Sequence, residues 1–377
     1  MEEHGVFAVL DGHGGRSAAS AGSGALEELL VQIAKQGTLD EKTAAKELED
    51  AFIEADVRLR AALPAEDRSG TTVVAAIITR QAPNDYCVQL AHAGDSRAVL
   101  HAGHRLVCSQ DHKPGRDDER QRILAAGGSV EHGPLGGGPL RVDGALAVSR
   151  ALGDFHFKPA EMTPARCKVT AVPEVQTIRN CSIGDWLLLA CDGVFDVMAN
   201  EEVDEMISAK VAKAAPGPVD GERVLAELLQ VCLDRGSKDN CTACLVQLME
   251  PGICQATSGS SRKLLQGGWE TAAREVKDKY AEFFEHEGFH AEARAVQQAG
   301  GGTAAAPSSP GSLPPRDTSD PAQASAQRGG SSSMPTAQRQ IVVLAKAMQA
   351  MRSSRTIQAA WRARRGSRED GAGGQST

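Results

Sequence analysis

Between about residues 5 and 250 the sequence predicts an α+β domain built in layers. Apolar runs rich in Val, Ile and Leu are interspersed with amphipathic helical patterns, so both kinds of element are present. Residues 71–100 hold consecutive extended runs with the turn sequence Pro83-Asn84-Asp85 between two of them, which is typical of antiparallel strands. Because strands and helices do not alternate regularly, we expect packed layers rather than a doubly wound parallel sheet.

The individual elements follow from the spacing of apolar residues. The predicted strands are residues 6–10, 71–79, 86–93, 98–100, 186–190 and 241–248. The predicted helices are residues 25–35, 43–63, 117–126, 201–213 and 222–235. Gly127-Gly128 and Gly236 follow the third and the last of these helices, as expected for helix C-termini. Together these elements define a first domain over residues 1–250.

The character of the chain changes after residue 250. Residues 251–299 place aromatic residues among charged ones, which predicts an amphipathic helical extension. Residues 300–338 are dominated by Gly, Ser, Ala, Pro and Gln and cannot bury enough apolar surface to offset their ordering entropy, so we expect a disordered linker. Residues 339–377 resume helical spacing, with Leu344 and Met348 on one side, and are predicted to form a basic amphipathic helix and tail.

The cysteines and the hydropathy of the sequence indicate in which cellular compartment the protein is expected. The chain has nine cysteines, an odd number mostly embedded in apolar runs, and no signal peptide opens it, which favours a reducing cytoplasmic or nuclear location. Cys241 and Cys244 form a CxxC, but positions three apart in a strand face opposite ways, so we expect buried strand residues there. No apolar stretch approaches the roughly 20 residues of a membrane span, so we expect a soluble protein without a transmembrane segment.

Charge is distributed unevenly along the chain. Residues 339–368 contain eight of the 41 Lys and Arg residues and no Asp or Glu, so the rest of this chain of net charge −8 carries −16. An acidic main part favours an enzyme with a carboxylate-rich site over a nucleic-acid binder.

Three acidic residues stand next to apolar runs. Asp11-Gly12 follows residues 6–10, Asp192-Gly193 follows residues 186–190, and Asp239 precedes residues 241–248. Carboxylates at strand ends, with Gly beside them to allow close approach of the backbone, are suited to a hard divalent cation. The pattern indicates a metal-dependent hydrolase.

Seven segments carry a more specific signal. They are VFAVLDGHGG at 6–15, SGTT at 69–72, GDSRAV at 94–99, DHKP at 111–114, LAVSRALGD at 146–154, LACDGVFDVM at 189–198 and GSKDN at 236–240. In this order they resemble the metal-dependent (type 2C) protein serine/threonine phosphatases. The resemblance implies a four-layer α-β-β-α sandwich of two β-sheets flanked by helices, and hydrolysis of phosphoserine and phosphothreonine in phosphoprotein substrates.

The resemblance also implies a centre of two Mg²⁺ or Mn²⁺ ions with a metal-activated water. By this likeness Asp11 bridges the two ions, Asp192 and Asp239 hold the first ion, and the carbonyl of Gly12 helps to hold the second. Oxygen ligands suit Mg²⁺ or Mn²⁺, whereas zinc more often brings His or Cys. Two such ions can activate a water and neutralise charge on the phosphoryl oxygens.

Further residues take roles by the same likeness. His13 matches the general acid that protonates the departing alkoxide, and the alternative is a turn histidine that touches only solvent. Asp111 and Asp196, together with Asp192, match the ligands of an additional, weaker metal. The alternative for Asp196 is an acid at a helix N-terminus, favoured by the helix dipole.

The N-terminal part departs from the family pattern. The family carries a phosphate-gripping Arg and a metal-ligating Glu before its first Asp-Gly-His segment, whereas ten residues precede Asp11 here. We therefore expect an N-terminally incomplete family member. It is either a short version of an active enzyme or a catalytically impaired pseudophosphatase that acts as a binding or adaptor protein. The retained Asp11, His13, Asp192 and Asp239 favour the first of these.

The C-terminal part suggests a partner. Residues 357–366, IQAAWRARRG, resemble an IQ motif, with Ala363 in place of the usual Gly. A basic amphipathic helix with Met and Trp anchors suits the Met-rich, acidic groove of calmodulin or another EF-hand protein, so we expect such a partner to bind residues 341–368. A solvated or membrane-surface helix is the alternative.

Overall fold

The computed structural model describes residues 3–37, 39–133, 136–237 and 239–250, the backbone of 341–345, and six single helical positions between 281 and 297. The chain divides into two units, Met1–Leu264 with Gln340–Thr377, and Leu265–Arg339. In the second unit only the six helical positions are described. The predicted linker and most of the predicted helical extension lie outside the described residues, so those domain boundaries stay predictions.

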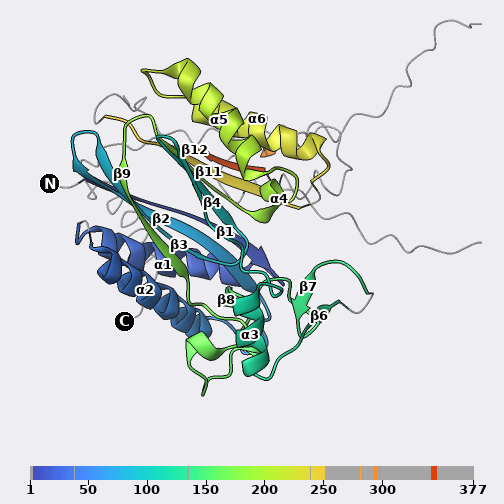
Figure 1. Cartoon of the computed structure of the whole chain (residues 1–377). Helices are drawn as coiled ribbons and strands as arrows, with labels where there is room; N and C mark the ends of the chain where they lie inside the picture. Colours follow the sequence, from blue (N-terminus) through green and yellow to red (C-terminus); the bar gives the residue numbers. More distant parts are fainter. Residues whose placement is uncertain are drawn as a thin grey trace, which may run out of the picture. The chain divides into compact units, whose positions relative to one another are not determined.

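Two five-stranded sheets form the first unit (Figure 1). The first sheet has the order β1-β2-β3-β9, with β8 also paired to β2, and all its pairs are antiparallel. Its strands are β1 (Glu3–His13), β2 (Gly70–Ala82), β3 (Asp85–Ala93), β8 (Leu152–Gly153) and β9 (Glu174–Cys181). The second sheet has the order β12-β11-β10-β4-β5, in which β11 and β12 pair in parallel. Its strands are β4 (Arg97–Ala102), β5 (Arg105–Cys108), β10 (Trp186–Ala190), β11 (Cys241–Gln247) and β12 (Ile341–Ala345).

Helices cover the outer face of each sheet. The helices α1 (Ser17–Ala34) and α2 (Glu41–Ala62) pack on the first sheet, and α5 (Asn200–Ala214) and α6 (Gly221–Asp234) pack on the second (Figure 1). Three apolar clusters separate the layers: one under α1 and α2, one between the sheets, and one under α5 and α6. Burial of these apolar faces is the main stabilising term of such a sandwich. The predicted α-β-β-α fold class is confirmed.

Strand alternation sorts side chains between these clusters. In β11, Cys241 lies in the cluster under α5 and α6, whereas Cys244 lies in the cluster between the sheets. The two cysteines of the CxxC therefore point to opposite faces, as the two-residue period of a strand requires. Among the described residues, free thiols are found at Cys87, Cys108, Cys167, Cys181, Cys191 and Cys232.

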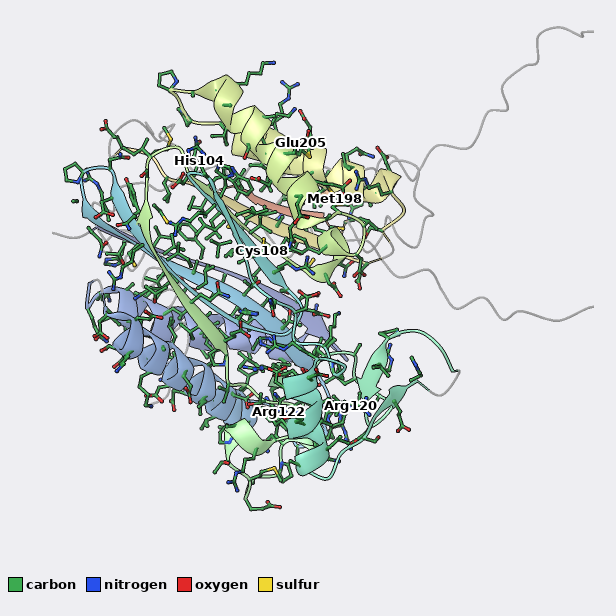
Figure 2. All side chains as sticks on the ribbon, viewed as in Figure 1. His104, Cys108, Arg120, Arg122, Met198 and Glu205 are labelled. Atoms are coloured by element: carbon green, nitrogen blue, oxygen red, sulfur yellow. The ribbon has the colours of Figure 1, made fainter. Side chains whose placement is uncertain are left out.

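A smaller layer lies at one end of the sheets. The helix α3 (Asp117–Ala125) and the hairpin of β6 (Val130–His132) and β7 (Leu140–Val142) enclose a small core that includes Ile123. Arg122, labelled in Figure 2, donates from α3 to the carbonyl oxygens of Ser149 and Cys167 and so ties this layer to the chain that follows.

Several elements differ from the sequence prediction, which did not include the short strands β5, β6, β7 and β8. The helix α1 begins at Ser17, eight residues before the predicted start, because small residues such as Gly22 pack closely against Leu59 of α2. The strand β9 was not predicted, since its residues are mostly half-buried and give no clear apolar run. Residues 341–345 form β12 and not the start of the predicted helix, because the β-branched run Ile-Val-Val favours extended backbone.

The rest of the predicted C-terminal helix lies outside the described residues. Among the residues that are described, no helix is both long and apolar enough to cross a bilayer.

Candidate metal centre

The three predicted carboxylates come from both sheets. Asp11 lies near the end of β1, Asp192 opens the short helix α4 (Asp192–Phe195) directly after β10, and Asp239 lies two residues before β11. Ligand atoms of Asp11, Cys191 and Asp192 all lie within 4.8 Å of one another. The fold thus brings Asp11 together with Asp192, although 180 residues separate them in sequence.

Charges in this group are crowded. Burial and the charges of Asp239 and Asp95 raise the pKa of Asp11 to about 6. Burial and the charges of Asp95 and Asp11 raise the pKa of Asp192 to about 8. The neighbouring carboxyl of Asp192 partly opposes the rise in the pKa of Asp11. The Oδ1 atom of Asp192 is buried and has no hydrogen-bond partner among the described residues. An orphaned oxygen beside repelling carboxylates fits a divalent cation.

Cys191 contributes a sulfur to this group. Burial, followed by the charge of Asp11, raises the pKa of its thiol to about 12. Its Sγ donates to the carbonyl oxygen of Asn240 and accepts from the N–H of Thr242, both at 3.1 Å. Since metals bind thiolate rather than thiol, the available donors are oxygens, which favours Mg²⁺ or Mn²⁺ over zinc.

His13 has a buried acidic partner. Its Nε2 lies 2.6 Å from Oδ2 of Asp154, whose side chain is 2% exposed. Burial alone would lower the pKa of His13, but the hydrogen bond and charge of Asp154 outweigh it and raise that pKa. His13 is therefore held in place by a carboxylate and disposed to carry a proton.

Asp154 was not among the predicted site residues. It lies immediately after β8, which pairs with β2, and its φ is +52°. A Cβ at Gly70 would lie 2.0 Å from Oδ2 of Asp154 and 2.5 Å from Nε2 of His13, so only glycine leaves room for this pair. The only sequence signal for Asp154 was its place at the end of the LAVSRALGD segment.

Asp95 is a second acidic residue that the prediction missed. It is 4% exposed, and its charge acts on Asp11, Asp192 and Asp196. The ammonium of Lys113 forms an ion pair with its Oδ2. Burial raises the pKa of Asp196, and Lys113 opposes that rise. Asp95 therefore belongs with Asp192 and Asp196 in an acidic group that includes one lysine.

Asp111 is paired with an arginine. Its two carboxylate oxygens accept from Nε and Nη2 of Arg97, each at 2.9 Å. Arg97 also donates to Asn200 and lies over the ring of Phe195. A bidentate guanidinium holds both oxygens of Asp111, whereas Lys113 pairs with one oxygen of Asp95, so each of the two carboxylates has a basic partner.

Two glycines decide how closely the backbone packs here. A Cβ at Gly193 would lie 2.3 Å from the carbonyl oxygen of Asn240, so Gly193 allows α4 to approach the start of β11. Gly12 lies opposite Thr71 in the β1–β2 ladder. The assignment of the Gly12 carbonyl to a metal stays a prediction.

Comparison with known proteins identifies the family of the chain. Residues 1–241 match the family model of protein phosphatase 2C. Among curated relatives, the mouse "Probable protein phosphatase 1N" is 37% identical over 242 residues, which cover 64% of this chain and 56% of the relative. Human "Protein phosphatase 1A" is 34% identical over 259 residues, which cover 65% of this chain and 63% of the relative. The chain thus spans little more than half the length of the curated relatives it matches.

Two solved structures resemble the described fold. A phosphatase from a pathogenic strain of Toxoplasma gondii aligns with a TM-score of 0.55 at 28% identity, covering 64% of this chain and 83% of the other. A sex determining protein of Caenorhabditis elegans aligns with a TM-score of 0.50 at 26% identity, covering 64% of this chain and 55% of the other.

Proposed function

Because the chain belongs to the protein phosphatase 2C family, we propose that it hydrolyses phosphoserine and phosphothreonine in proteins at a centre of two Mg²⁺ or Mn²⁺ ions. The observation that carries the proposal is the meeting of Asp11 and Asp192 from two different sheets, with an unpartnered buried oxygen on Asp192. Both residues lie within the segment that matches the family.

The oxygen atoms of the site can be assigned as ligands of the individual cations. We assign Asp11, Asp192 and Asp239 to the two ions, with the Gly12 carbonyl as a further ligand. Asp111, Asp192 and Asp196 would hold a third, weaker ion. When bound, the divalent cations would supply charge neutralisation for the phosphoryl oxygens and a more acidic water.

His13 is assigned to proton transfer. Nε2 of His13 is occupied by Asp154, so Nδ1 is the atom that can hand a proton to the departing serine or threonine oxygen. The raised pKa of His13 keeps this proton available near neutral pH. Asp154 orients the ring and stabilises its charged form, and it does not itself contact the substrate in this assignment.

The test measures Mn²⁺ binding and turnover separately. Calorimetry counts the Mn²⁺ ions bound by the chain, and hydrolysis of para-nitrophenyl phosphate and of a phosphothreonine peptide measures turnover. We expect two tight ions, a loss of binding in Asp239→Asn, and a loss of at least about 100-fold in turnover in His13→Gln with Mn²⁺ still bound. His104→Gln, at the exposed position labelled in Figure 2, is the control and should change neither quantity.

Two results would overturn the proposal. A wild-type chain that binds no Mn²⁺ would remove the metal centre. A chain that binds two Mn²⁺ ions but hydrolyses neither substrate would instead be the impaired adaptor, the other function weighed for this sequence.

We further propose that the C-terminal segment 341–368 binds calmodulin or a related EF-hand protein. The IQ-like sequence at 357–366 and the excess of basic residues support this assignment. Pull-down of the full chain by calmodulin, with and without calcium, tests it, with Ile357→Glu as the disrupting variant and Thr356→Ala as the control. Absence of binding in both conditions would reject it.

A further inference from the structure

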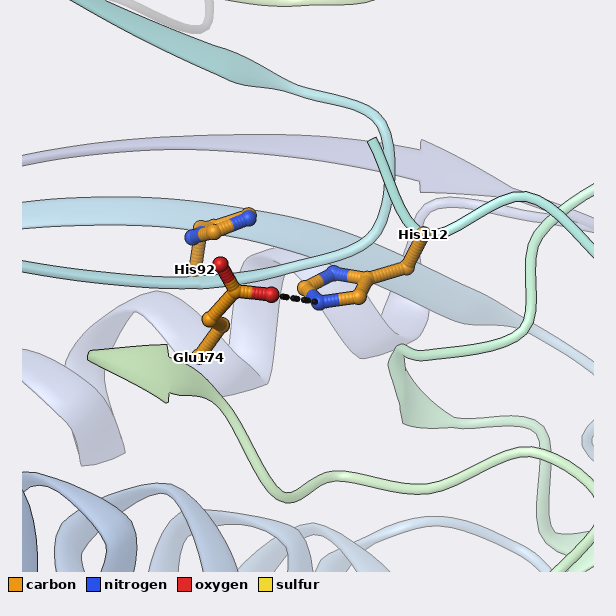
Figure 3. A group of neighbouring side chains, drawn as sticks. All are labelled: His92, His112 and Glu174. Atoms are coloured by element: carbon orange, nitrogen blue, oxygen red, sulfur yellow. Dashed lines mark ion pairs between the residues drawn. The ribbon is translucent and has the colours of Figure 1, made fainter. Parts of the chain in front are cut away.

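A second group of metal-type side chains lies apart from Asp11 and Asp192. His92 of β3, His112 of the segment between β5 and α3, and Glu174 of β9 offer ligand atoms within 4.8 Å of one another (Figure 3). His92 is 1% and His112 is 0% exposed, whereas the Glu174 side chain is 33% exposed. Two histidines and a carboxylate are a common ligand set for zinc.

The hydrogen bonds of His112 oppose a metal at this group. Its Nδ1 lies 3.2 Å from the backbone nitrogen of Gly94, and a backbone N–H can only donate. Nδ1 is therefore the acceptor, and the ring proton of neutral His112 is on Nε2. That Nε2 faces Oε2 of Glu174 at 3.4 Å, as the dashed line in Figure 3 marks. A cation at Nε2 would have to displace this proton while Nδ1 stays occupied.

Ring geometry leads to the same conclusion. The rings of His92 and His112 are stacked, with centroids 4.5 Å apart and an angle of 25° between their planes. The lone pair of an imidazole nitrogen lies in the ring plane, so two stacked rings cannot both direct one at a single ion. Nε2 of His92 also donates to the carbonyl oxygen of Gln110 at 2.9 Å. Nε2 of His112 has no hydrogen-bond partner among the described residues and only faces Glu174, but the bond at Nδ1 and the stacking of the two rings still disfavour a cation here.

The contacts of His112 fix the backbone of Gly94. His112 binds Gly94 through both backbone groups: its N–H donates to the Gly94 carbonyl oxygen at 2.9 Å, and its Nδ1 accepts from the Gly94 N–H. Gly94 has a φ of +117°, and a Cβ there would lie 2.6 Å from the side chain of Thr72. The next residue is Asp95, the buried carboxylate of the acidic group. The position of His112 therefore determines where Asp95 is presented.

We propose that His112 is a positioning residue for the metal centre: its Nδ1, which accepts from the Gly94 N–H, and its backbone N–H, which donates to the Gly94 carbonyl oxygen, fix Gly94 and through it Asp95. The effect on ion affinity rests on the proposed function, whereas the effect on Asp95 does not. Outer residues that orient metal-binding groups are worth about 10- to 100-fold in metal affinity in other proteins.

Two substitutions separate positioning from simple packing. Asn places an acceptor oxygen close to the position of a histidine Nδ1, so His112→Asn should keep the Gly94 bond and retain Mn²⁺ affinity within about threefold. Leu has no acceptor, so His112→Leu should weaken Mn²⁺ binding about 10-fold or more. His101→Leu is the control, because His101 is a half-buried histidine in β4 of the second sheet and is paired to Asp204 of α5.

Nuclear magnetic resonance supplies readouts that need no metal. In the metal-free wild-type chain, the imidazole nitrogens of His112 should report a proton on Nε2. The amide resonance of Asp95 should move in His112→Leu and stay in place in His112→Asn. If His112→Leu does not fold, the wild-type tautomer and the Asn variant still decide the question.

The results that would overturn this inference differ from those that would overturn the proposed function. A proton on Nδ1 of His112, an unmoved Asp95 resonance in a folded His112→Leu, or zinc binding to the wild type that His112→Asn abolishes would each overturn the inference. A wild-type chain that binds no Mn²⁺ overturns the proposed function alone, because the tautomer and the Asp95 resonance are still measured.

Discussion

At the scale of single residues, the candidate centre lowers the stability of the folded chain because it places buried carboxylates close together. Burial and mutual repulsion raise the pKa values of Asp11 and Asp192, so the folded chain binds more protons at these sites than the unfolded chain does. Stability contributed by such groups falls as pH rises from the unfolded value near 4 toward the folded values of about 6 and about 8. The site therefore opposes folding in neutral solution without cations.

Removing one of these charges should stabilise the metal-free chain. We predict that Asp192→Asn increases the free energy of unfolding at about pH 8 by about 0.5–2 kcal/mol and abolishes the stabilisation that Mn²⁺ gives the wild type. Thermal unfolding with and without Mn²⁺ measures both effects. Glu205→Gln, at the exposed position labelled in Figure 2, is the control and should change neither. A less stable metal-free Asp192→Asn chain would contradict the repulsion that we infer.

Metal binding should release protons. At neutral pH, Asp192, with a pKa of about 8, is largely protonated in the metal-free chain, and a cation must displace that proton. We therefore predict that Mn²⁺ affinity rises between about pH 6 and pH 9, and that proton release per chain falls over the same range. Calorimetry in buffers of different ionisation enthalpy measures both. An affinity that is flat over this range would show that Asp192 is already ionised.

The residues that the sequence could predict are those whose role shows locally. Asp11 and Asp192 follow apolar runs beside glycine, and that pattern indicated them, whereas the role of His13 was implied by the family likeness. Asp154 could not be assigned in this way, because its role depends on contact with His13, which lies 141 positions away. Asp111 was indicated by the family likeness, and its bidentate contact with Arg97 depends on the fold.

At the scale of elements, long periodic segments were predictable and edge segments were not. The helix α2 and the strand β10 carry clear periodic or continuous apolar patterns, and both appear at nearly the predicted bounds. The strand β9 lies at a sheet edge, where half-buried residues dilute the pattern. In β12 the local β-branched run and the open edge of β11 outweigh helical spacing.

The approach of α4 to β11 depends on the missing side chain of Gly193. We predict that Gly193→Ala costs about 1–3 kcal/mol of stability and weakens Mn²⁺ binding, because the added Cβ would meet the Asn240 carbonyl and push Asp192 away from Asp239. The control is Gly24→Ala in α1, where a Cβ meets nothing within 4 Å and a gain of about 0.5–1 kcal/mol is expected. Denaturant unfolding and calorimetry measure these changes, and unaltered Mn²⁺ affinity in Gly193→Ala would contradict the argument.

At the scale of the whole first unit, the candidate metal ligands come from the regions of both sheets. Asp11 belongs to the first sheet, whereas Asp192 and Asp239 lie at the ends of strands in the second. Between the sheets, the other contacts are largely the non-directional packing of apolar side chains. Bound cations would add a directional link at one edge of this interface.

This link predicts where Mn²⁺ slows hydrogen exchange. A ligand at about 100 times its dissociation constant stabilises a chain by about 2.7 kcal/mol, so amides that exchange through opening of the two sheets should slow about 100-fold. We expect this slowing in both β1 and β11, since each sheet supplies ligands, and a smaller effect in the hairpin β6–β7, which supplies none. Exchange measured by mass spectrometry tests it, with Asp239→Asn as the variant that should lose the slowing. Protection confined to one sheet would mean that the cations bind within that sheet and do not join the two.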